Sequence, residues 1–237
     1  MRDQEELPCI AKELLSKGYR VIGLSRSITS EIEILKELHG NDRYIHINYD
    51  LLNVNGIKEL YKNTLRPLTK ENGIHAFINN AAMAYDDIIT NLNYDPLDEM
   101  FKVNVFSPMM ITKYMLRDML LHKTKGNIIH ISSISAHTGY KGLAMYASTK
   151  GAMEAFSKNT AREWGALGIR SNIVCPGFMD TEMSASLSDD QKKRIFNRNS
   201  MKKPVVVEAV ATTVLFLLEN TGKGITGQIL HVDNGTI

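Results

Sequence analysis

Residues 126–150 read GNIIHISSISAHTGYKGLAMYASTK. The apolar residues at the start of this segment predict a buried strand, and residues from about Ala147 to Ala166 predict a helix. Ser133 follows the strand, and Tyr146 precedes Lys150 by four positions. Because positions i and i+4 share one face of a helix, we expect the Tyr146 phenol and the Lys150 ammonium to be neighbours, with the Ser133 hydroxyl beside them.

These three side chains are suited to acid–base chemistry on an oxygen atom. A free tyrosine has a pKa near 10. An ammonium about 4 Å away stabilises a tyrosinate by roughly 4 kcal/mol at an effective dielectric constant near 20, or about three pKa units, which brings the phenol near 7. Ser133 can hydrogen-bond the oxygen of a carbonyl or an alcohol. The alternative interpretation is an ordinary i,i+4 pair of tyrosine and lysine on a helix.

The composition fits one globular domain that spans residues 1–237. Of the 237 residues 43% are hydrophobic and 23% charged, with a net charge of +2. The mixed charges do not favour binding to nucleic acid or to an anionic membrane, and the apolar runs are too short for a membrane span. Cys9 and Cys175 stand far apart without a CxxC motif, so we expect no metal site and a reduced, cytoplasmic protein.

Short apolar strands alternate with helices along the chain. Strands are expected at 20–24, 44–47, 74–78, 126–131, 169–174 and 228–232. Helices are expected at 11–18, 29–38, 54–68, 98–121, 147–166, 188–197 and 206–219. This alternation predicts an α/β fold, a Rossmann-like doubly wound parallel sheet with helices on both faces. Ligands of such sheets bind at the carboxyl ends of the strands.

Short motifs at those strand ends resemble the short-chain dehydrogenase/reductase family, and within it the 3-oxoacyl-carrier-protein reductases. The resemblance covers about residues 10–237 and rests on Asn79-Asn80-Ala81-Ala82, Val103-Asn104, the set of Ser133, Tyr146 and Lys150, Pro176-Gly177 with Thr181, and Thr226-Gly227-Gln228. It implies an oxidoreductase that transfers a hydride between NAD(P)(H) and a small carbonyl or alcohol. The alternative is a non-catalytic or cofactor-impaired family member that acts as a subunit or binding protein.

The resemblance also implies roles for single residues. Tyr146 is expected to exchange the proton, Lys150 to lower its pKa and to hold the nicotinamide ribose, and Ser133 to orient the substrate oxygen. Asn104 is expected to anchor a proton-relaying water, and the alternative is a buried asparagine bonded to backbone. Further cofactor contacts are expected at Ser25, Arg26, Asp50, Leu51, Asn80, Ala81, Ala82, Pro176, Gly177, Met179 and Thr181.

The end of the strand at residues 20–24 bears on the choice of cofactor. It reads Leu24-Ser25-Arg26-Ser27, without an acidic side chain. Sheets that bind NAD usually place an acid there for the ribose 2′-hydroxyl, whereas an arginine suits a 2′-phosphate. We therefore expect NADP(H), with NAD(H) as the alternative.

The substrate pocket and the oligomer are predicted more coarsely. Residues 83–95 and 178–203 are expected to line the pocket, and we expect His137 to lie on a loop surface. Pocket candidates are Met83, Tyr85, His137, Tyr140, Phe178 and Met183. The helix at 98–121 carries more apolar residues than one buried stripe needs, which favours a homodimer or homotetramer. These residues are Met100, Phe101, Val105, Met109, Ile111, Met115 and Leu116.

The family's first strand and its glycine-rich turn are absent from residues 1–237. The glycines of that turn let the backbone approach the cofactor pyrophosphate at a helix N-terminus. Three interpretations stay open: a shortened enzyme, a degenerate relative, or a replacement of the strand by residues 1–10. We expect Glu5 or Glu6 near the pyrophosphate, weak NADP(H) binding by these residues, and a gap or a foreign segment between strands 20–24 and 76–78.

Overall fold

The computed structural model of the chain describes residues 6–181, 184 and 187–237, so Glu5 and Met183 lie outside the described residues. The described residues form two compact units. The first comprises the described parts of Met1–Asp50 and Pro176–Phe216 together with Val232–Ile237, and the second comprises Leu51–Cys175 and Leu217–His231. No helix among the described residues is long and apolar enough to cross a membrane.

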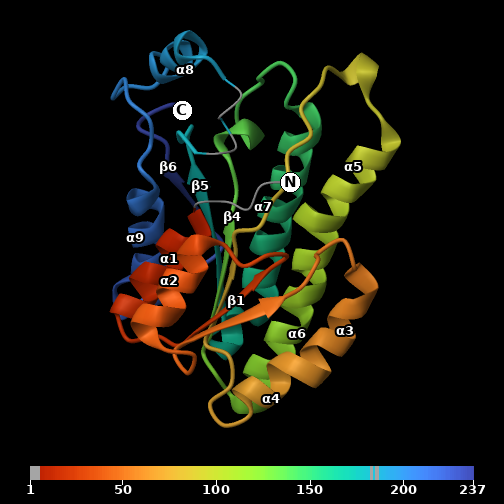
Figure 1. The fold of residues 1–237 in the computed structure, drawn as a ribbon, viewed down its shortest axis with the longest axis vertical. Helices are drawn as coiled ribbons and strands as arrows, with labels where there is room; N and C mark the ends of the chain where they lie inside the picture. Colours follow the sequence, from red (N-terminus) through yellow and green to blue (C-terminus); the bar gives the residue numbers. More distant parts are fainter. Residues whose placement is uncertain (1–5, 182–183, 185–186) are drawn as a thin grey trace. The chain divides into compact units, whose positions relative to one another are not determined.

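The first unit contains a two-stranded parallel sheet. Strand β1 (Val21–Ser25) pairs with β2 (Tyr44–Asn48). Helices α1 (Glu6–Ser16) and α2 (Ser30–His39) pack against each other and against these strands (Figure 1). The helix α1 begins earlier than expected, and it tolerates Pro8 because this residue stands in the first turn, where a missing N–H costs nothing. One core cluster of this unit consists of Ala11, Leu15, Ile32, Leu35 and Tyr44.

The remainder of the first unit includes helix α8 (Asp189–Phe196) and helix α9 (Val207–Leu218) except for the last two residues of α9, which belong to the second unit. Ser188 and Gln191 form a capping box at the start of α8, which satisfies two backbone N–H groups there. Near the C-terminus, the Asp233 carboxylate accepts hydrogen bonds from the backbone of the last residues, among them Thr236 and Ile237. These local bonds fix the start of α8 and the chain after β6 (Ile229–Val232).

The second unit contains a four-stranded sheet. Its order is β3 (Ala76–Asn79), β4 (Asn127–Ile131), β5 (Arg170–Pro176) and β6 (Ile229–Val232). Strand β4 is parallel to both β3 and β5. Helix α6 (Ser107–His122) packs on β3, and α7 (Ala144–Trp164) packs on β4 (Figure 1). Strand β4 is buried from residue 128 to 131, as a continuous apolar run predicts.

The strands therefore form two separate sheets. One contains β1 and β2, and the other contains β3, β4, β5 and β6 in that order. Within the described residues no strand pairs with both β1 and β3. Strands 20–24 and 76–78 therefore share no neighbour among the described residues, as expected, and the order within each sheet fits a Rossmann-like topology without its first strand.

Two helices that we expected to be regular contain a π-helical turn. The expected helix 54–68 consists of η1 (Val54–Gly56), α3 (Ile57–Leu60), η2 (Tyr61–Leu65) and α4 (Arg66–Thr69). The expected helix 98–121 consists of α5 (Tyr94–Phe101), η4 (Lys102–Phe106) and α6. Each π turn ends two residues before a proline, Pro67 or Pro108, which is the second residue of the helix that follows. Because proline donates no N–H and crowds the carbonyl four residues back, a wider turn accommodates it.

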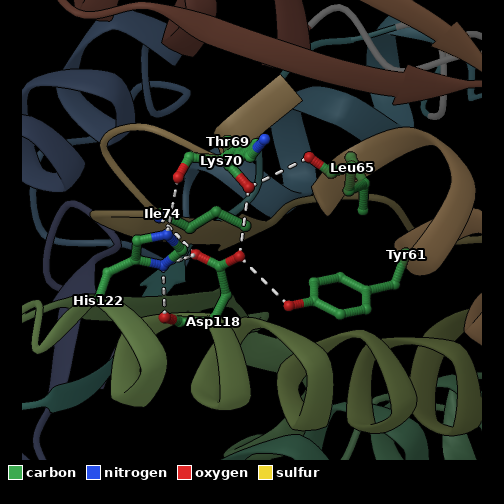
Figure 2. A network of polar contacts seen from close by, with 7 residues as sticks. All are labelled: Tyr61, Leu65, Thr69, Lys70, Ile74, Asp118 and His122. Atoms are coloured by element: carbon green, nitrogen blue, oxygen red, sulfur yellow. Dashed lines mark hydrogen bonds and ion pairs between the residues drawn. The ribbon is translucent and has the colours of Figure 1, made fainter. Parts of the chain in front are cut away.

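A buried carboxylate joins these helices in the second unit (Figure 2). Asp118 on α6 is 0% exposed. Its Oδ1 accepts a hydrogen bond from the Ile74 backbone N–H at 2.8 Å. Its Oδ2 accepts from the Tyr61 hydroxyl at 3.3 Å and from the Thr69 hydroxyl at 3.2 Å. One side chain thus connects η2, α4 and the residues before β3 to helix α6.

His122 completes this cluster one turn further along α6. Its Nδ1 lies 3.3 Å from Asp118 Oδ1 and donates to the Asp118 carbonyl at 3.0 Å, and its Nε2 donates to the Lys70 carbonyl at 3.2 Å. Since both nitrogens face acceptors, the protonated imidazole is favoured. The carbonyls of Asp118 and Lys70, followed by the Asp118 carboxylate, raise the pKa of His122.

Candidate active site

Tyr146 and Lys150 both lie within helix α7, which begins at Ala144 rather than at Ala147 as expected. The turn before the helix contains Gly142 at φ 87°, a backbone conformation that favours glycine. The Nζ atom of Lys150 lies 5.4 Å from the centroid of the Tyr146 ring. It donates a hydrogen bond to the Ile131 carbonyl at 2.9 Å, and the lysine is 5% exposed. The end of β4 therefore holds a buried ammonium beside the phenol.

Ser133 follows β4 and begins the 3₁₀ helix η5 (Ile134–Ala136). Its Oγ accepts hydrogen bonds from the Ser135 backbone N–H at 3.2 Å and from the Ser135 hydroxyl at 3.1 Å. Ser133 is half-buried. Because its oxygen accepts twice from Ser135, the hydrogen of its own hydroxyl remains to be donated to an oxygen of a bound molecule.

Asn104 lies in the π turn η4 and is buried. Its Nδ2 donates to the Met83 carbonyl at 2.8 Å, and its Oδ1 accepts from the Met83 N–H at 2.8 Å. The same Nδ2 donates to Thr149 Oγ1 at 3.1 Å, and that hydroxyl donates to the Tyr146 carbonyl at 2.7 Å. The backbone-bonded asparagine, our alternative interpretation, is thus present, while the water relay stays a prediction.

Sequence reasoning missed two neighbours of this set. Thr149 could have been suspected from the sequence, since it directly precedes Lys150. In the structure it connects Asn104 to Tyr146. His130 gave no signal, because a single histidine in an apolar strand has no distinguishing pattern. It is fully buried in β4 between the rings of Phe77 and Phe156, at centroid distances of 6.2 and 6.0 Å. Burial and, secondly, the Lys150 charge lower the pKa of His130 to about 3, so it is neutral at physiological pH.

The expected cofactor residues are divided between the two units. Within the second unit, Asn80 is buried just after β3, Ala81 and Ala82 are half-buried, and the Leu51 carbonyl accepts a hydrogen bond from Ser107. Asn80, Ala81 and Ala82 follow the end of β3, a strand of the same unit as Tyr146 and Lys150, whereas Leu51 follows β2 of the first unit.

The other expected cofactor residues belong to the first unit. The Ser25 hydroxyl donates to the Ser27 carbonyl at 2.7 Å and lies 2.8 Å from His46 Nε2. Arg26 is half-buried, and Asp50 is exposed after β2. At the end of β5, Pro176 and Gly177 are buried, and Met179 and Thr181 are half-buried. The residues after β1 thus present the Arg26 guanidinium without a neighbouring carboxylate, which fits a phosphate group.

A further group of side chains was not foreseen. One ring nitrogen of His137, one of His231 and the Cys175 thiol lie within 4.8 Å of one another in the second unit. These residues are far apart in the sequence and follow no metal-binding spacing, so the sequence predicted no metal site. His137 is exposed, as expected.

The chain is similar to known proteins over nearly its whole length. A family model described as enoyl-(acyl carrier protein) reductase matches residues 8–236. The 3-oxoacyl-[acyl-carrier-protein] reductase FabG of Buchnera aphidicola subsp. Acyrthosiphon pisum is 34% identical over 226 residues, which cover 95% of this chain and 90% of the relative.

Solved structures show the same fold. ElxO with NADP bound superposes with a TM-score of 0.86 at 25% identity, over 98% of this chain and 94% of that one. A short chain dehydrogenase from Burkholderia cenocepacia J2315 in complex with NADP gives a TM-score of 0.87 at 23% identity, with the same coverage of 98% and 94%.

Proposed function

Because the chain belongs to the short-chain dehydrogenase/reductase family of NAD(P)-dependent oxidoreductases, we propose that it interconverts a carbonyl and an alcohol with NADP(H), as a reductase of 3-oxoacyl groups. The name of the FabG relative supports this substrate class. The observation that carries the proposal is the pairing of the buried Lys150 ammonium with the Tyr146 phenol, beside a serine whose hydroxyl hydrogen remains to be donated.

Reduction of a ketone requires a hydride at carbon and a proton at oxygen. Bound NADPH supplies the hydride. Ser133 donates a hydrogen bond to the substrate oxygen and polarises the carbonyl. Tyr146 donates its phenolic proton to that oxygen, and the positive charge of Lys150 stabilises the phenolate that remains. In the reverse direction the phenolate takes the proton of the alcohol.

Asn104 and Thr149 hold this arrangement in place. Asn104 bonds to both backbone groups of Met83 and to Thr149, and Thr149 bonds to the carbonyl of Tyr146. They therefore position the first turn of α7 against the segment after β3. We retain for Asn104 the further role of anchoring a water that carries protons to Lys150.

The residues expected to contact the cofactor keep their proposed roles. Arg26 binds the 2′-phosphate, for which a guanidinium without a neighbouring carboxylate is suited, and Ser25 contacts the cofactor beside it. Tyr146 and Lys150 bind the nicotinamide ribose. The remaining contacts are Asp50, Leu51, Asn80, Ala81, Ala82, Pro176, Gly177, Met179 and Thr181.

We also propose that the chain acts as one domain and as a homodimer or homotetramer. One family model spans residues 8–236, which supports a single domain. Of the apolar residues expected to face a partner, Met100, Val105, Ile111, Met115 and Leu116 are already buried within the chain. On the same helices, however, the large side chains of Phe106, Leu120 and Leu121 are exposed, and they support self-association.

Cellular location remains a proposal as well. Neither Cys9 nor Cys175 is in a disulfide, which suits a reducing compartment. We propose that the protein acts in the cytoplasm.

A comparison of two thioesters tests the proposed reaction. The NADPH absorbance is followed with a 3-oxoacyl thioester and, separately, with a 2-enoyl thioester of equal chain length. We expect oxidation of NADPH with the 3-oxo compound only, because the phenol and the serine deliver a proton to oxygen, whereas enoyl reduction places it on carbon. Turnover of the enoyl compound alone would reassign the substrate. Turnover of neither would favour a non-catalytic role.

A further inference from the structure

The cluster of His137, Cys175 and His231 lies at the carboxyl ends of β4, β5 and β6. Two backbone hydrogen bonds fix the pairing of β5 with β6: Ile173 N–H to the Gln228 carbonyl at 2.9 Å, and Gly177 N–H to the Val232 carbonyl at 2.9 Å. Both strands advance by four residues between these bonds, so they run parallel. This register sets Cys175 opposite His231, with both side chains on one face of the sheet.

His137 reaches the same place from the next strand. It directly follows η5, and its backbone N–H is fixed by a hydrogen bond to the Ile134 carbonyl at 2.9 Å. Its ring lies 4.8 Å from the ring of His231, with an angle of 61° between the planes. Three strand ends thus bring two imidazoles and one thiol together without a local sequence motif.

The distances are close to those of a metal site. The three ligand atoms lie within 4.8 Å of one another. In a tetrahedral zinc site with bonds of about 2.3 Å to sulfur and 2.0–2.1 Å to nitrogen, ligand atoms stand roughly 3.3–3.6 Å apart. Side-chain rotations that close about 1 Å are therefore sufficient. The two histidines are exposed and Cys175 is buried, so an ion can enter from solvent and meet the thiol beneath.

A carboxylate supports one of the histidines. Glu154 on α7 is buried, and its Oε1 accepts hydrogen bonds from His137 Nε2 at 3.0 Å and from the Ser132 hydroxyl. This bond leaves His137 Nδ1 to bind a metal. Histidine ligands usually donate their second N–H to a carboxylate, which fixes the ring and increases its basicity. Two surface histidines without a carboxylate partner would be weaker evidence for a metal site.

We propose that His137, Cys175 and His231 bind a zinc-class transition metal ion, with Zn²⁺ as the physiological candidate. Two imidazoles and a thiolate are the donor set that zinc prefers and that calcium and magnesium avoid. The fourth position is open to solvent. The bound ion ties the segment after Ser133 to β5 and β6, while the residues proposed for hydride transfer are not among its ligands.

Cobalt(II) reports on this site in the purified full-length protein, because thiolate coordination gives it a charge-transfer absorption and tetrahedral geometry intensifies its visible bands. We expect one equivalent of Co²⁺ to produce both signals and Zn²⁺ to remove them. Cys175→Ser is expected to abolish the charge-transfer band, and His231→Gln to weaken the affinity for Zn²⁺ at least tenfold. Glu154→Gln, which acts through His137, is expected to weaken it by about 10–100-fold.

Two control variants show whether a loss of metal binding is specific to the cluster. Cys9→Ser and His75→Gln change the same residue types outside the cluster and are expected to leave both signals unchanged. His231 is exposed, so His231→Gln serves if Cys175→Ser fails to fold, as judged by circular dichroism. The proposal is overturned if Co²⁺ gives no charge-transfer band, or if Zn²⁺ binds equally well to Cys175→Ser and His231→Gln.

Discussion

Replacement of Asp118 by alanine should cause a large loss of stability in the second unit. The carboxylate is 0% exposed and accepts from Ile74, Tyr61 and Thr69 (Figure 2). Thr69 keeps a second acceptor, the Leu65 carbonyl at 3.1 Å. The Ile74 N–H and the Tyr61 hydroxyl lose theirs, and a buried donor without an acceptor costs about 1–3 kcal/mol. We therefore expect a loss of about 3–5 kcal/mol, a large part of a typical free energy of unfolding of about 5–15 kcal/mol.

Asp118→Asn should be milder. The remaining amide oxygen can still accept from Ile74, while the new NH₂ group can donate to the hydroxyl oxygens of Tyr61 and Thr69. We expect a loss of about 1–3 kcal/mol, which corresponds to the exchange of charge-assisted for neutral hydrogen bonds. Glu71→Gln removes a carboxylate from an exposed position and should change stability by less than about 0.5 kcal/mol.

Urea unfolding followed by the fluorescence of Trp164, the single tryptophan, measures these changes. The ring packs against the core cluster of Leu116, Met119, Ile128 and Ile169 and so reports on the second unit. The midpoint should fall while the slope m stays constant. An alanine variant within about 1 kcal/mol of the parent, at equal m, would refute the assignment of Asp118 as the main polar link of this unit.

The pH dependence gives a second check on this cluster. Because the pKa of His122 is raised in the folded protein, its stabilising contribution is complete below about pH 6.5 and is lost as pH rises through the raised value. The difference in stability between the parent and His122→Gln should therefore shrink as pH rises above about 6.5. The comparison with the variant is needed because His130, whose pKa is lowered to about 3, gives the opposite slope: its contribution is lost as pH falls below about 6.5.

Three further predictions concern the site and the assembly. Tyr146→Phe should abolish nearly all turnover with an unchanged circular dichroism spectrum, and substantial kcat in this variant would remove Tyr146 from the reaction. Arg26→Asp should shift the ratio of kcat/KM for NADPH over NADH about ten- to a hundredfold toward NADH, from a charge-assisted pair of about 1.5–3 kcal/mol, and a parent that already prefers NADH would contradict it. Light scattering at micromolar concentration should give the mass of a dimer or tetramer, and Leu121→Glu should reduce it; a monomeric parent rules out self-association.

Local sequence patterns predicted the parts of the fold that rest on local physics. The apolar run of β4 and the spacing of Tyr146 and Lys150 correctly placed a buried strand before a helix with both residues on it. The missing first strand predicted a gap or a foreign segment between strands 20–24 and 76–78, and no strand among the described residues pairs with both β1 and β3. The helix start was displaced by three residues, because the turn at Gly142 allows the helix to begin before Tyr146.

Contacts between distant segments could not be predicted in this way. The hydrogen bond between Ser25 and His46 joins the neighbouring strands β1 and β2. The cluster of His137, Cys175 and His231 depends on the register of β5 and β6. The π turns had a visible cause in Pro67 and Pro108, but the sequence does not show whether a helix responds to a proline by ending or by widening.

Isotope transfer tests the central claim most directly. The protein is incubated with NADPH that carries deuterium at the transferable position of the nicotinamide, together with a 3-oxoacyl thioester, and the product is analysed by mass spectrometry and NMR. We predict a 3-hydroxyacyl thioester with deuterium on the carbinol carbon, formed by the parent and absent from Tyr146→Phe. A product without deuterium at that carbon, or equal formation by Tyr146→Phe, would contradict hydride transfer assisted by this tyrosine.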